Sequence, residues 1–247
     1  MPDTEPDGSR SLLLTILLPC LNEAETVGGC IENARSGLRA AGIAAEQSEI
    51  IVADNGSTDR SAAIARDHGA RVIAAQPVGY GAALQAGISA ARSQYVIMAD
   101  ADGSYDLTAL SPFVERLGTG CTLVIGTRLC GEIRAGAMPF LSRYVGNPAL
   151  TAIGNRLFGT QISDYHCGLR GFDRAALLAL NLRAPGMEFA TEMIVRAASA
   201  HLSIAEVPIV YNIAGRSRPS HLRPWRDGWR HLRLMLHLWT IQRVQAL

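Results

Sequence analysis

Short apolar runs alternate with stretches of helical periodicity through the first half of the chain. The runs predict strands because they are short and apolar on both faces; they cover residues 12–18, 50–53, 71–75, 95–99 and 123–126. Between them, apolar positions recur every three or four residues and predict helices over residues 25–41, 59–68, 81–91 and 108–117. Strands of this kind that alternate with helices indicate an α/β fold, with a mostly parallel central sheet and helices on both faces.

The pattern changes after Arg128. Residues 129–140 are rich in Gly, Ala and Pro and predict a loop. Further on, the pattern predicts a helix, a polar turn, a second helix and a strand, at residues 141–158, around Asp164, and at 188–200 and 204–211. We divide the chain into residues 1–128 and 129–215, two halves of one domain, and a tail of residues 216–247.

The tail is basic and amphipathic. Arginines alternate in it with large apolar side chains; the arginines include Arg223, Arg226, Arg230 and Arg233, and the apolar residues include Trp225, Trp229, Leu232, Leu236 and Trp239. Such a helix is typical of the membrane interface, where aromatic anchors enter the lipid and arginines face anionic headgroups. The alternative is a helix that packs its apolar face on the domain. We expect no nucleic-acid partner, because the positive charge is confined to this tail.

Composition narrows the class of protein. The chain has 247 residues and a net charge of +1, as expected of a single globular domain with a substantial core. Its five cysteines form no Cys-x-x-Cys pair, which favours reduced thiols and a cytoplasmic protein. Acidic residues precede the first apolar run, which is therefore not expected to be a signal peptide. No window reaches the roughly 20 apolar residues of a membrane span.

Polar clusters follow three of the predicted strands at their carboxyl ends. Asn22 and Glu23 follow the first strand, residues 54–59 the second, and residues 100–106 the fourth. In open parallel sheets, ligands bind in the crevice outside these ends. The three clusters are therefore expected to lie at one ligand site.

Asp100 and Asp102 flank a single alanine directly after the fourth strand. In an extended segment alternate side chains point to the same face, so the two carboxylates can converge. Mg²⁺ and Mn²⁺ prefer carboxylate oxygens together with substrate phosphate oxygens. The pair therefore predicts a metal site, although the triplet taken alone is equally compatible with two solvated turn aspartates. Asp106 either supports that site or begins the next helix.

The segment of residues 54–59, Asp-Asn-Gly-Ser-Thr-Asp, has the composition of a turn that caps the following helix. The carboxylate of Asp54 also suits pairing with a base N–H or a ribose hydroxyl. Gly79 and Gly81 flank a tyrosine before a predicted helix and would let the backbone approach a ribose or a phosphate. The chain has neither a P-loop nor a complete dinucleotide-binding fingerprint.

The order of these motifs resembles the family 2 glycosyltransferases of GT-A fold. The motifs are Pro-x-x-Asn-Glu at residues 19–23, Asp-Asn-Gly-Ser-Thr-Asp at 54–59 and Asp-Ala-Asp at 100–102. Within that family the chain is most similar to the polyprenyl-phosphate sugar transferases of the dolichol-phosphate mannose synthase group, from about Leu12 to Leu234. The resemblance implies an inverting enzyme that moves a hexose from a nucleoside-diphosphate sugar to a polyprenyl phosphate, with Mg²⁺ or Mn²⁺.

On the donor side, the resemblance implies that Pro19, Glu23 and Asp54 hold the nucleoside. Asp100 and Asp102 match the family's metal and diphosphate motif. The backbone at Gly81 is expected to face the donor.

Residues 216–222 resemble a mobile loop that closes over the donor diphosphate. Its cationic side chains are Arg216, Arg218 and His221. The family usually has a lysine where this chain has His221, and histidine is a weaker, pH-dependent cation. The main contact with the diphosphate is therefore expected to pass to Arg216 or Arg218.

On the acceptor side, Arg128 falls where the family has an arginine that faces the acceptor phosphate, and Arg143 resembles its companion. Asp164 matches an aspartate near the transferred sugar. An acceptor phosphate is anionic and needs no general base, whereas a hydroxyl needs one, for which Asp164 and His166 are the candidates. Asp102, Asp164 and Arg128 are the expected catalytic residues.

Two other functions are compatible with the sequence. In the first, the acceptor is a soluble hydroxyl compound, as in metabolite glycosylation. In the second, the chain is an inactive nucleotide-sugar-binding protein. Glu188 and Glu192 lie one helical turn apart, and either begin a helix or contact sugar hydroxyls. Arg170 can pair with either acid. The expected location is the cytoplasm, with peripheral contact to the inner face of the membrane through the tail.

Overall fold

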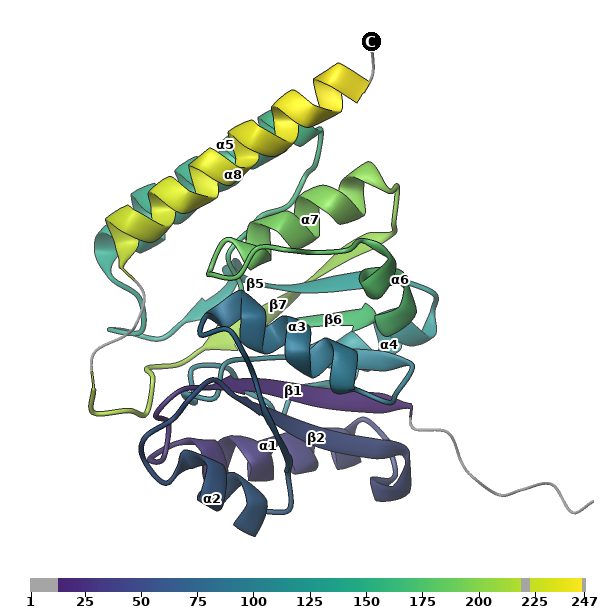
Figure 1. Ribbon diagram of the computed structural model, residues 1–247, viewed down its shortest axis with the longest axis vertical. Helices are drawn as coiled ribbons and strands as arrows, with labels where there is room; N and C mark the ends of the chain where they lie inside the picture. The colour runs from purple at the N-terminus through teal and green to yellow at the C-terminus, as the bar shows by residue number, and fades with distance from the viewer. Residues whose placement is uncertain (1–12, 219–222, 246–247) are drawn as a thin grey trace, which may run out of the picture.

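The protein contains a seven-stranded sheet in the strand order β3-β2-β1-β4-β6-β5-β7 (Figure 1). The computed structural model describes residues 13–218 and 223–245. Every strand runs parallel to its neighbours except β6, which is antiparallel to β4 and β5. The strands are β1 (Leu14–Cys20), β2 (Ser48–Asp54), β3 (Arg71–Ala74), β4 (Tyr95–Met98), β5 (Leu123–Ile133), β6 (Arg170–Asp173) and β7 (Ile204–Tyr211).

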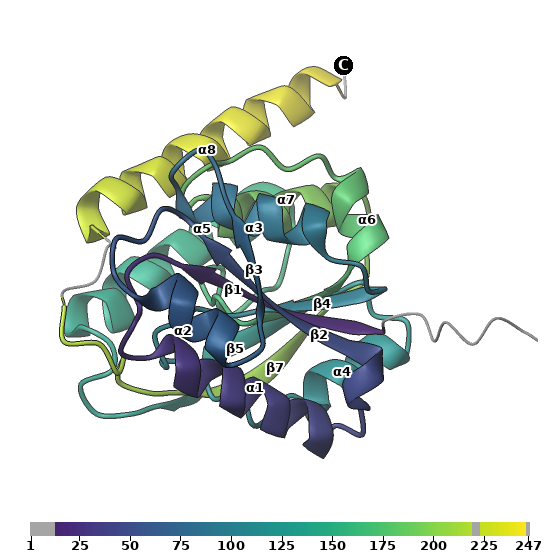
Figure 2. The same cartoon turned by 60° about the horizontal axis from the view of Figure 1, so that its bottom comes forward.

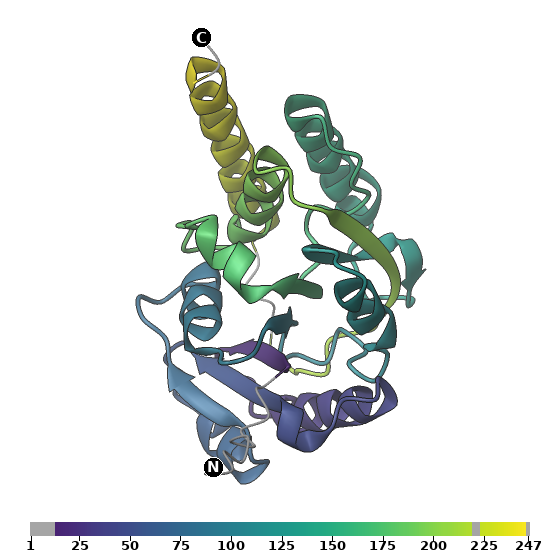
Figure 3. The same ribbon diagram turned by 90° about the vertical axis from the view of Figure 1, so that its right-hand side faces the viewer.

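Helices cover both faces of the sheet (Figure 3), which confirms the predicted α/β architecture. Helices α1, α2 and α4 pack on one face and α3, α6 and α7 on the other, while α5 and α8 lie side by side beyond α7. Their bounds are α1 (Val27–Ala40), α2 (Ser61–Asp67), α3 (Tyr80–Ala90), α4 (Ser111–Gly118), α5 (Asn147–Phe158), α6 (Arg174–Ala179), α7 (Phe189–Ser199) and α8 (Pro224–Gln245). Short turns are formed by η1 (Ala45–Gln47) and by the π-helical η2 (Ser142–Gly146), which precedes α5.

Strand β1 lies in the interior of the sheet, and all of its residues are buried. A strand that is apolar on both faces is stable only where helices cover both sides, which is why the apolar runs predicted this architecture. The strand continues past the predicted end at residue 18, because Pro19 and Cys20 pair with Ala53 and Asp54 of β2. The first polar cluster therefore begins directly at the end of the sheet.

The prediction of a loop over residues 129–140 is wrong in its first part, because β5 continues to Ile133. The pairing of β5 with β7 shifts register between Thr127 and Glu132 and then resumes. A Cβ at Gly131 would lie 2.1 Å from the carbonyl oxygen of Ile209, so glycine is needed there for the close approach of β7. The small residues that indicated a loop thus serve strand packing, and the irregularity re-aims the chain near Arg128.

Strand β6 and helix α6 were not predicted from the sequence. Strand β6 is four residues long and contains arginine, glycine and aspartate, so it shows no apolar alternation. It forms because it fills the space between β4 and β5 and pairs with both. The side chain of Asp173 accepts a hydrogen bond from the backbone N–H of Ala176 at 2.8 Å, and so caps α6.

Helix α8 confirms the predicted amphipathic helix of the tail, and it packs against α5 and α7 (Figure 1). One stripe of the helix is buried on the domain; it consists of Asp227, His231, Met235 and Leu238. The Thr191 hydroxyl of α7 lies 2.7 Å from His231 Nδ1. Within residues 13–218 and 223–245, no helix has both the length and the apolar character to cross a membrane.

Candidate functional site

The carboxyl ends of β1, β2 and β4 meet at one edge of the sheet (Figure 2). The chain proceeds from β1 to β2 on one side and later to β4 on the other, and open α/β sheets bind ligands at such a position. Glu23 follows β1, Asp54 is the last residue of β2, and Asp100 follows β4. The structure thus brings the three polar clusters to this one edge of the sheet, which we call the crevice after the position where open sheets bind ligands.

Asp100 and Asp102 are held in place by different parts of the chain. The Tyr80 hydroxyl donates to Asp100 Oδ1 at 2.9 Å, and the backbone N–H of Ser104 donates to Asp102 Oδ1 at 2.9 Å. The Thr26 hydroxyl donates at 2.7 Å to the backbone carbonyl between the two aspartates. The triplet is therefore a pair of oriented carboxylates and not a solvated turn.

The environment of the pair suits a divalent cation. Burial, together with the negative charge of Asp102, raises the pKa of Asp100 from 3.8 to about 7. Two carboxylates that repel each other in a partly buried crevice attract a cation. Hard cations such as Mg²⁺ accept one or two protein carboxylates and complete their shell with phosphate oxygens and water. Two carboxylates at one place on the sheet edge match this requirement; within the described residues, no group of three or more potential ligand side chains occurs.

Arginines from a distant segment lie on this acidic cluster. Arg216 Nη1 is 2.5 Å from Asp102 Oδ2 and 3.4 Å from Glu23 Oε1. Arg218 pairs with the Glu23 carboxylate and donates at 2.8 Å to the backbone carbonyls of Leu21 and Asn22. Two side chains predicted to contact a diphosphate thus contact acidic residues, and the third, His221, lies outside the described residues.

The other residues predicted on the donor side have structural partners. Pro19 is buried within β1. Asp54 Oδ1 accepts from the backbone N–H of Ser57 at 3.3 Å, which closes the predicted turn. A Cβ at Gly81 would lie 2.2 Å from the carbonyl oxygen of Ala184, so glycine is needed there for packing of α3. Sterics alone account for this glycine.

Arg128 and Asp164 form a buried ion pair. The guanidinium donates from Nε to Asp164 Oδ2 at 2.7 Å and from Nη2 to Oδ1 at 2.8 Å. Arg128 also stacks over the ring of Tyr211, with 5.3 Å from Cζ to the ring centroid. Burial alone would raise the pKa of Asp164, but the charge and hydrogen bonds of Arg128 hold it below its usual value. The arginine predicted to face the acceptor is thus oriented by the predicted catalytic aspartate.

His166 lies beside this ion pair. Its backbone N–H donates to Asp164 Oδ1 at 3.1 Å, and its ring stands edge-on to His231 with the centroids 4.5 Å apart. Both ring nitrogens are buried and have no hydrogen-bond partner in the described part of the chain. Burial lowers the pKa of His166 well below its usual value, so the ring is neutral at physiological pH.

Within the described residues, Arg143 shares no hydrogen-bond, ion-pair or ring partner with Arg128. It lies in η2, and its guanidinium stacks over the ring of Tyr144 at 5.2 Å. The structure therefore brings together Arg128 and Asp164, but it leaves Arg143 on a separate turn next to α5.

Arg170 pairs with neither of the acids considered for it. Its guanidinium is fully buried and donates to the backbone carbonyls of Tyr165, Cys167 and Ala190. Glu192 accepts two backbone N–H bonds from the segment before α7 and a bond from Arg196 at 2.8 Å. Glu192 is thus structural. Glu188 has one buried oxygen without a hydrogen bond, 3.7 Å from Arg230 Nε of α8.

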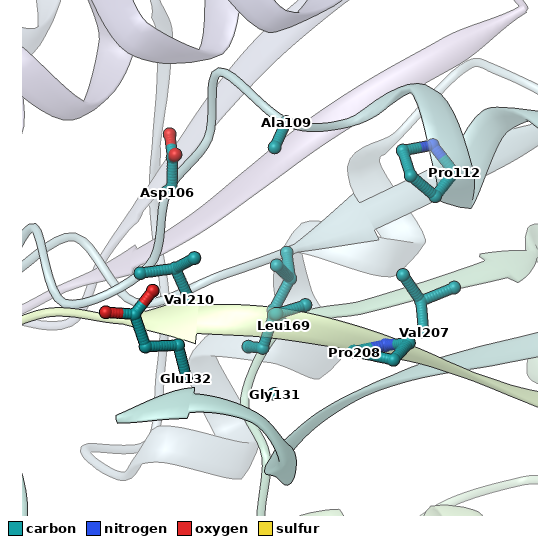
Figure 4. A pocket seen from close by; sticks show the side chains of 10 residues that line it. Asp106, Ala109, Pro112, Gly131, Glu132, Leu169, Val207, Pro208 and Val210 are labelled. Atoms are coloured by element: carbon teal, nitrogen blue, oxygen red, sulfur yellow. The ribbon is translucent and has the colours of Figure 1, made fainter. Parts of the chain in front are cut away.

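A hollow of about 240 Å³ lies away from this crevice (Figure 4). It is bordered by β7, by the end of β5 and by the segment before α4, which includes Asp106. None of the residues predicted on the donor or acceptor side lines it. Asp106 itself accepts from the backbone N–H and hydroxyl of Thr108 at 2.9 and 2.6 Å, and so closes a turn before α4.

Comparison with known proteins identifies the family of the chain. The model of the family described as Glycosyl transferase family 2 matches residues 15–180, which include the acidic triplet, Arg128 and Asp164. The chain belongs to glycosyl transferase family 2.

Relatives of this glycosyltransferase include two proteins of Haloferax volcanii. A low-salt glycan biosynthesis hexosyltransferase is 40% identical over 93% of this chain and 54% of the relative. The chain thus spans about half the length of that relative. A dolichyl-phosphate hexose transferase is 30% identical over 87% of this chain and 89% of that protein.

Solved structures share the fold of this glycosyltransferase. Glucosyl-3-phosphoglycerate synthase from Mycobacterium tuberculosis, in complex with Mn²⁺, uridine diphosphate and glucosyl-3-phosphoglycerate, superposes with a TM-score of 0.70 at 24% identity and covers 93% of this chain and 80% of that chain. The same synthase with Mg²⁺ and uridine diphosphate gives a TM-score of 0.69, also at 24% identity. The likeness shows that the fold is of the GT-A type.

Tyr80 is a residue of the glycosyltransferase site that the sequence analysis did not select. It begins α3, and its hydroxyl donates to the carboxylate of Asp100, which follows β4. The signal in the sequence was its position between Gly79 and Gly81, which was interpreted only as a backbone approach to a ligand. Its role depends on where α3 lies relative to β4.

Asp100→Asn is expected to stabilise the metal-free glycosyltransferase at a pH above 7 and to have little effect near pH 3.8. An acid whose pKa is raised by folding stabilises the fold below its unfolded pKa, and this contribution is lost as pH rises to the folded pKa, with a limiting slope of about 1.4 kcal/mol per pH unit. Asparagine has no charge to bury and still accepts the hydrogen bond from Tyr80. Melting temperatures of both proteins in chelator, measured across this range, test the expectation; a difference that does not grow with pH contradicts it.

Proposed function

We propose that this glycosyltransferase moves a hexose, with inversion, from a nucleoside-diphosphate sugar to a polyprenyl phosphate and requires Mg²⁺ or Mn²⁺. The observation that carries the proposal is the oriented pair of Asp100 and Asp102 in the crevice of the sheet, with cationic Arg216 against it. The dolichyl-phosphate hexose transferase among the relatives supports the acceptor. The fold neighbours solved with Mn²⁺ or Mg²⁺ and uridine diphosphate support the donor and the metal.

On the donor side, Asp100 and Asp102 would hold the metal together with oxygens of the diphosphate. A bound metal would neutralise the negative charge that develops on the leaving diphosphate. Arg216, which lies on Asp102, would bind the same phosphates, and Glu23 and Asp54 would accept hydrogen bonds from the nucleoside. In this scheme the donor is held by residues 1–128 and covered by the basic loop at the start of 216–247.

On the acceptor side, which is formed by residues 129–215, Arg128 would hold the acceptor phosphate. Asp164 bonds to two of its guanidinium nitrogens, while Nη1 donates no hydrogen bond within the described part of the chain. Nη1 is therefore the atom that would donate to an incoming phosphate. Asp164 acts as a positioning residue for Arg128, and Arg143 is the candidate for a second phosphate contact.

A phosphate acceptor is favoured because neither predicted base fits proton abstraction. The carboxylate of Asp164 is buried and committed to Arg128, and the ring nitrogens of His166 are buried. A phosphate oxygen is already anionic and needs no base. It forms a bond to the anomeric carbon as the bond to the diphosphate oxygen breaks on the opposite face, and the enzyme contributes positioning and charge neutralisation.

A soluble hydroxyl acceptor is the second candidate, and one observation favours it. The fold neighbour glucosyl-3-phosphoglycerate synthase was solved with glucosyl-3-phosphoglycerate, a soluble compound. In that case the acceptor would be a small water-soluble molecule that enters from the same side as Arg128.

A transfer assay separates these functions. Labelled nucleoside-diphosphate sugars are incubated with the protein, Mn²⁺ or Mg²⁺, and either short-chain polyprenyl phosphate or a panel of soluble hydroxyl compounds, with chelator as the control. Metal-dependent label in an organic-soluble product supports the proposal. A water-soluble product alone supports the second candidate, and the absence of metal-dependent turnover of every donor would support an inactive binding protein.

An apolar rim at the start of α8 suits contact with a membrane that carries the acceptor. The rim is defined by exposed residues of η2 and its approach and by the first turns of α8: Phe140, Leu141, Tyr144, Val145, Trp225 and Trp229. The two elements are in contact, and Phe140 and Trp225 are 75% and 83% exposed. The single acid of α8, Asp227, is buried, so the exposed charges beside the rim are arginines. Aromatic anchors with cations suit an anionic lipid surface, and we assign the protein to the cytoplasmic face of such a membrane.

The double variant Trp225→Ser/Trp229→Ser is expected to lower binding to anionic vesicles by about tenfold or more, because two large side chains no longer enter the lipid. Flotation of the full chain with phosphatidylglycerol vesicles measures the bound fraction. Leu178→Ser is the matched control, since Leu178 is exposed on α6, outside the rim. Equal flotation of wild type and double variant, or no flotation of wild type, contradicts the assignment.

A further inference from the structure

Residues 212–218 cross the acidic crevice, and we call them the strap. The backbone N–H groups of Asn212 and Gly215 donate at 2.8 Å to carbonyls of the loop after β4. Ser217 donates from its N–H at 2.6 Å and from its hydroxyl at 2.5 Å to the carboxylate of Glu25, in the loop after β1. The strap is thus attached on both sides of the crevice.

Arg216 of the strap lies where a metal ion would contact Asp102. Its Nη1 is 2.5 Å from Asp102 Oδ2, and its side chain is only 15% exposed. Guanidinium keeps its positive charge throughout the physiological pH range. A cation at this oxygen offsets the repulsion between Asp100 and Asp102. Arg216 therefore gives the acidic pair the positive charge that a metal ion would give it.

We propose that Arg216 is the resident counter-ion of the crevice, which a divalent metal displaces from Asp102 and the donor diphosphate then captures. This inference rests on the proposed metal site, and it concerns the order in which that site is filled. Metal without nucleotide must replace the contact between Arg216 and Asp102, so it binds weakly. When the diphosphate is present, the displaced guanidinium gains phosphate oxygens as partners.

Metal and nucleotide are therefore expected to bind cooperatively. The metal breaks the contact between Arg216 and Asp102, and the diphosphate then provides a new partner for the freed guanidinium. Conversely, when the diphosphate draws Arg216 away, the metal provides the cation that Asp102 has lost. Because the coupling of two binding equilibria is reciprocal, the factor by which nucleotide strengthens metal binding equals the factor by which metal strengthens nucleotide binding. Removing the charge of Arg216 should reduce this factor, whether it is measured as the effect of nucleotide on metal binding or as the effect of metal on nucleotide binding.

Arg216→Gln is expected to bind Mn²⁺ about tenfold more tightly than wild type when no nucleotide is present, and to bind nucleoside diphosphate with Mn²⁺ more weakly. The opposite signs distinguish a counter-ion from a residue that merely supports the fold. Free Mn²⁺ is measured by electron paramagnetic resonance during titration of the full chain, first alone and then with uridine or guanosine diphosphate. Arg66→Gln, on the surface of α2, is the matched control and should behave as wild type.

Glu25→Gln is the second variant, and it keeps the test valid if Arg216→Gln does not fold. It weakens the attachment of the strap at Ser217 and changes no residue assigned to the metal. Tighter binding of Mn²⁺ alone, by a smaller factor than for Arg216→Gln, is expected. Unchanged or weaker binding of Mn²⁺ by the folded variants overturns the inference.

The inference and the proposed function fail in different ways. If Arg216→Gln tightens Mn²⁺ binding but neither protein turns over any donor, the counter-ion role stands and the transferase proposal is wrong. If wild type transfers sugar with Mn²⁺ and the variants bind Mn²⁺ as wild type does, the transferase proposal stands and the counter-ion role is wrong.

Discussion

Asp102→Asn is expected to lower kcat/KM for sugar transfer by about a thousandfold while the protein keeps its fold, since the loss of a group that stabilises developing charge costs factors of this size. Asparagine has nearly the same shape, and its side-chain oxygen still accepts the N–H of Ser104. What disappears is the negative charge that would hold the metal and that now faces Arg216. The measurement is kcat/KM with saturating Mn²⁺, together with circular dichroism of the purified variant.

Asp106→Asn is the matched control for this variant. Asp106 lies four residues further along the same loop and closes a turn with Thr108, a hydrogen bond that asparagine also accepts. Its activity should stay within about twofold of wild type, because surface substitutions of this kind have small effects. If Asp102→Asn retains activity, or if both variants lose it to the same extent, Asp102 is not the metal-binding carboxylate.

Asp164→Asn is expected to destabilise the protein by about 3–5 kcal/mol, because removing one partner of a buried ion pair leaves the other charge uncompensated. The side chain of Asp164 is 0% exposed and that of Arg128 is 8% exposed. For a chain of this length, the loss corresponds to a fall in melting temperature of about 10 °C. Thermal and denaturant unfolding, compared with wild type under the same buffer conditions, measure it.

Glu132→Gln provides the exposed counterpart. Glu132 pairs with Arg134 at 2.8 Å, but their side chains are 55% and 58% exposed. Exposed pairs contribute about 0–1 kcal/mol, so this variant should melt within a few degrees of wild type. If replacing the buried carboxylate destabilises no more than replacing the exposed one, the pair does not hold Arg128 in place. The double variant Arg128→Met/Asp164→Leu should melt at a higher temperature than Asp164→Asn, since it removes both buried charges and leaves neither without a partner.

Much of the fold was predictable because it depends on local patterns. Runs that are apolar on both faces can be buried only inside a covered parallel sheet, so β1 to β4, the beginning of β5 and the helices between them were predicted with small shifts at their ends. β6 and the second half of β5 were not predictable in this way. β6 is polar and short, and it forms because it pairs with β4 on one side and β5 on the other. The glycine in the second half of β5 is needed because the backbone of Ile209 lies too close for a Cβ.

The same distinction between local patterns and long-range contacts applies to the candidate site. The carboxyl ends of parallel strands lie at one edge of their sheet, so the sequence sufficed to place Glu23, Asp54 and Asp100 at that edge. The roles of the arginines were not accessible to the same reasoning. Arg216 meets Asp102 across 114 residues of chain, and nothing in the local pattern of either segment indicates the other.

The amino-acid sequence by itself therefore determined that carboxylates gather at the carboxyl end of a parallel sheet, because strand periodicity and chain order suffice to bring them there. Only the tertiary structure decided which cation lies on each carboxylate. Arg128 is held by Asp164 in the interior, and Arg216 lies on Asp102 in the crevice. The physical reason is that an ion pair depends on the folded path of the whole chain, which brings distant charges within a few ångströms and removes the water that would screen them.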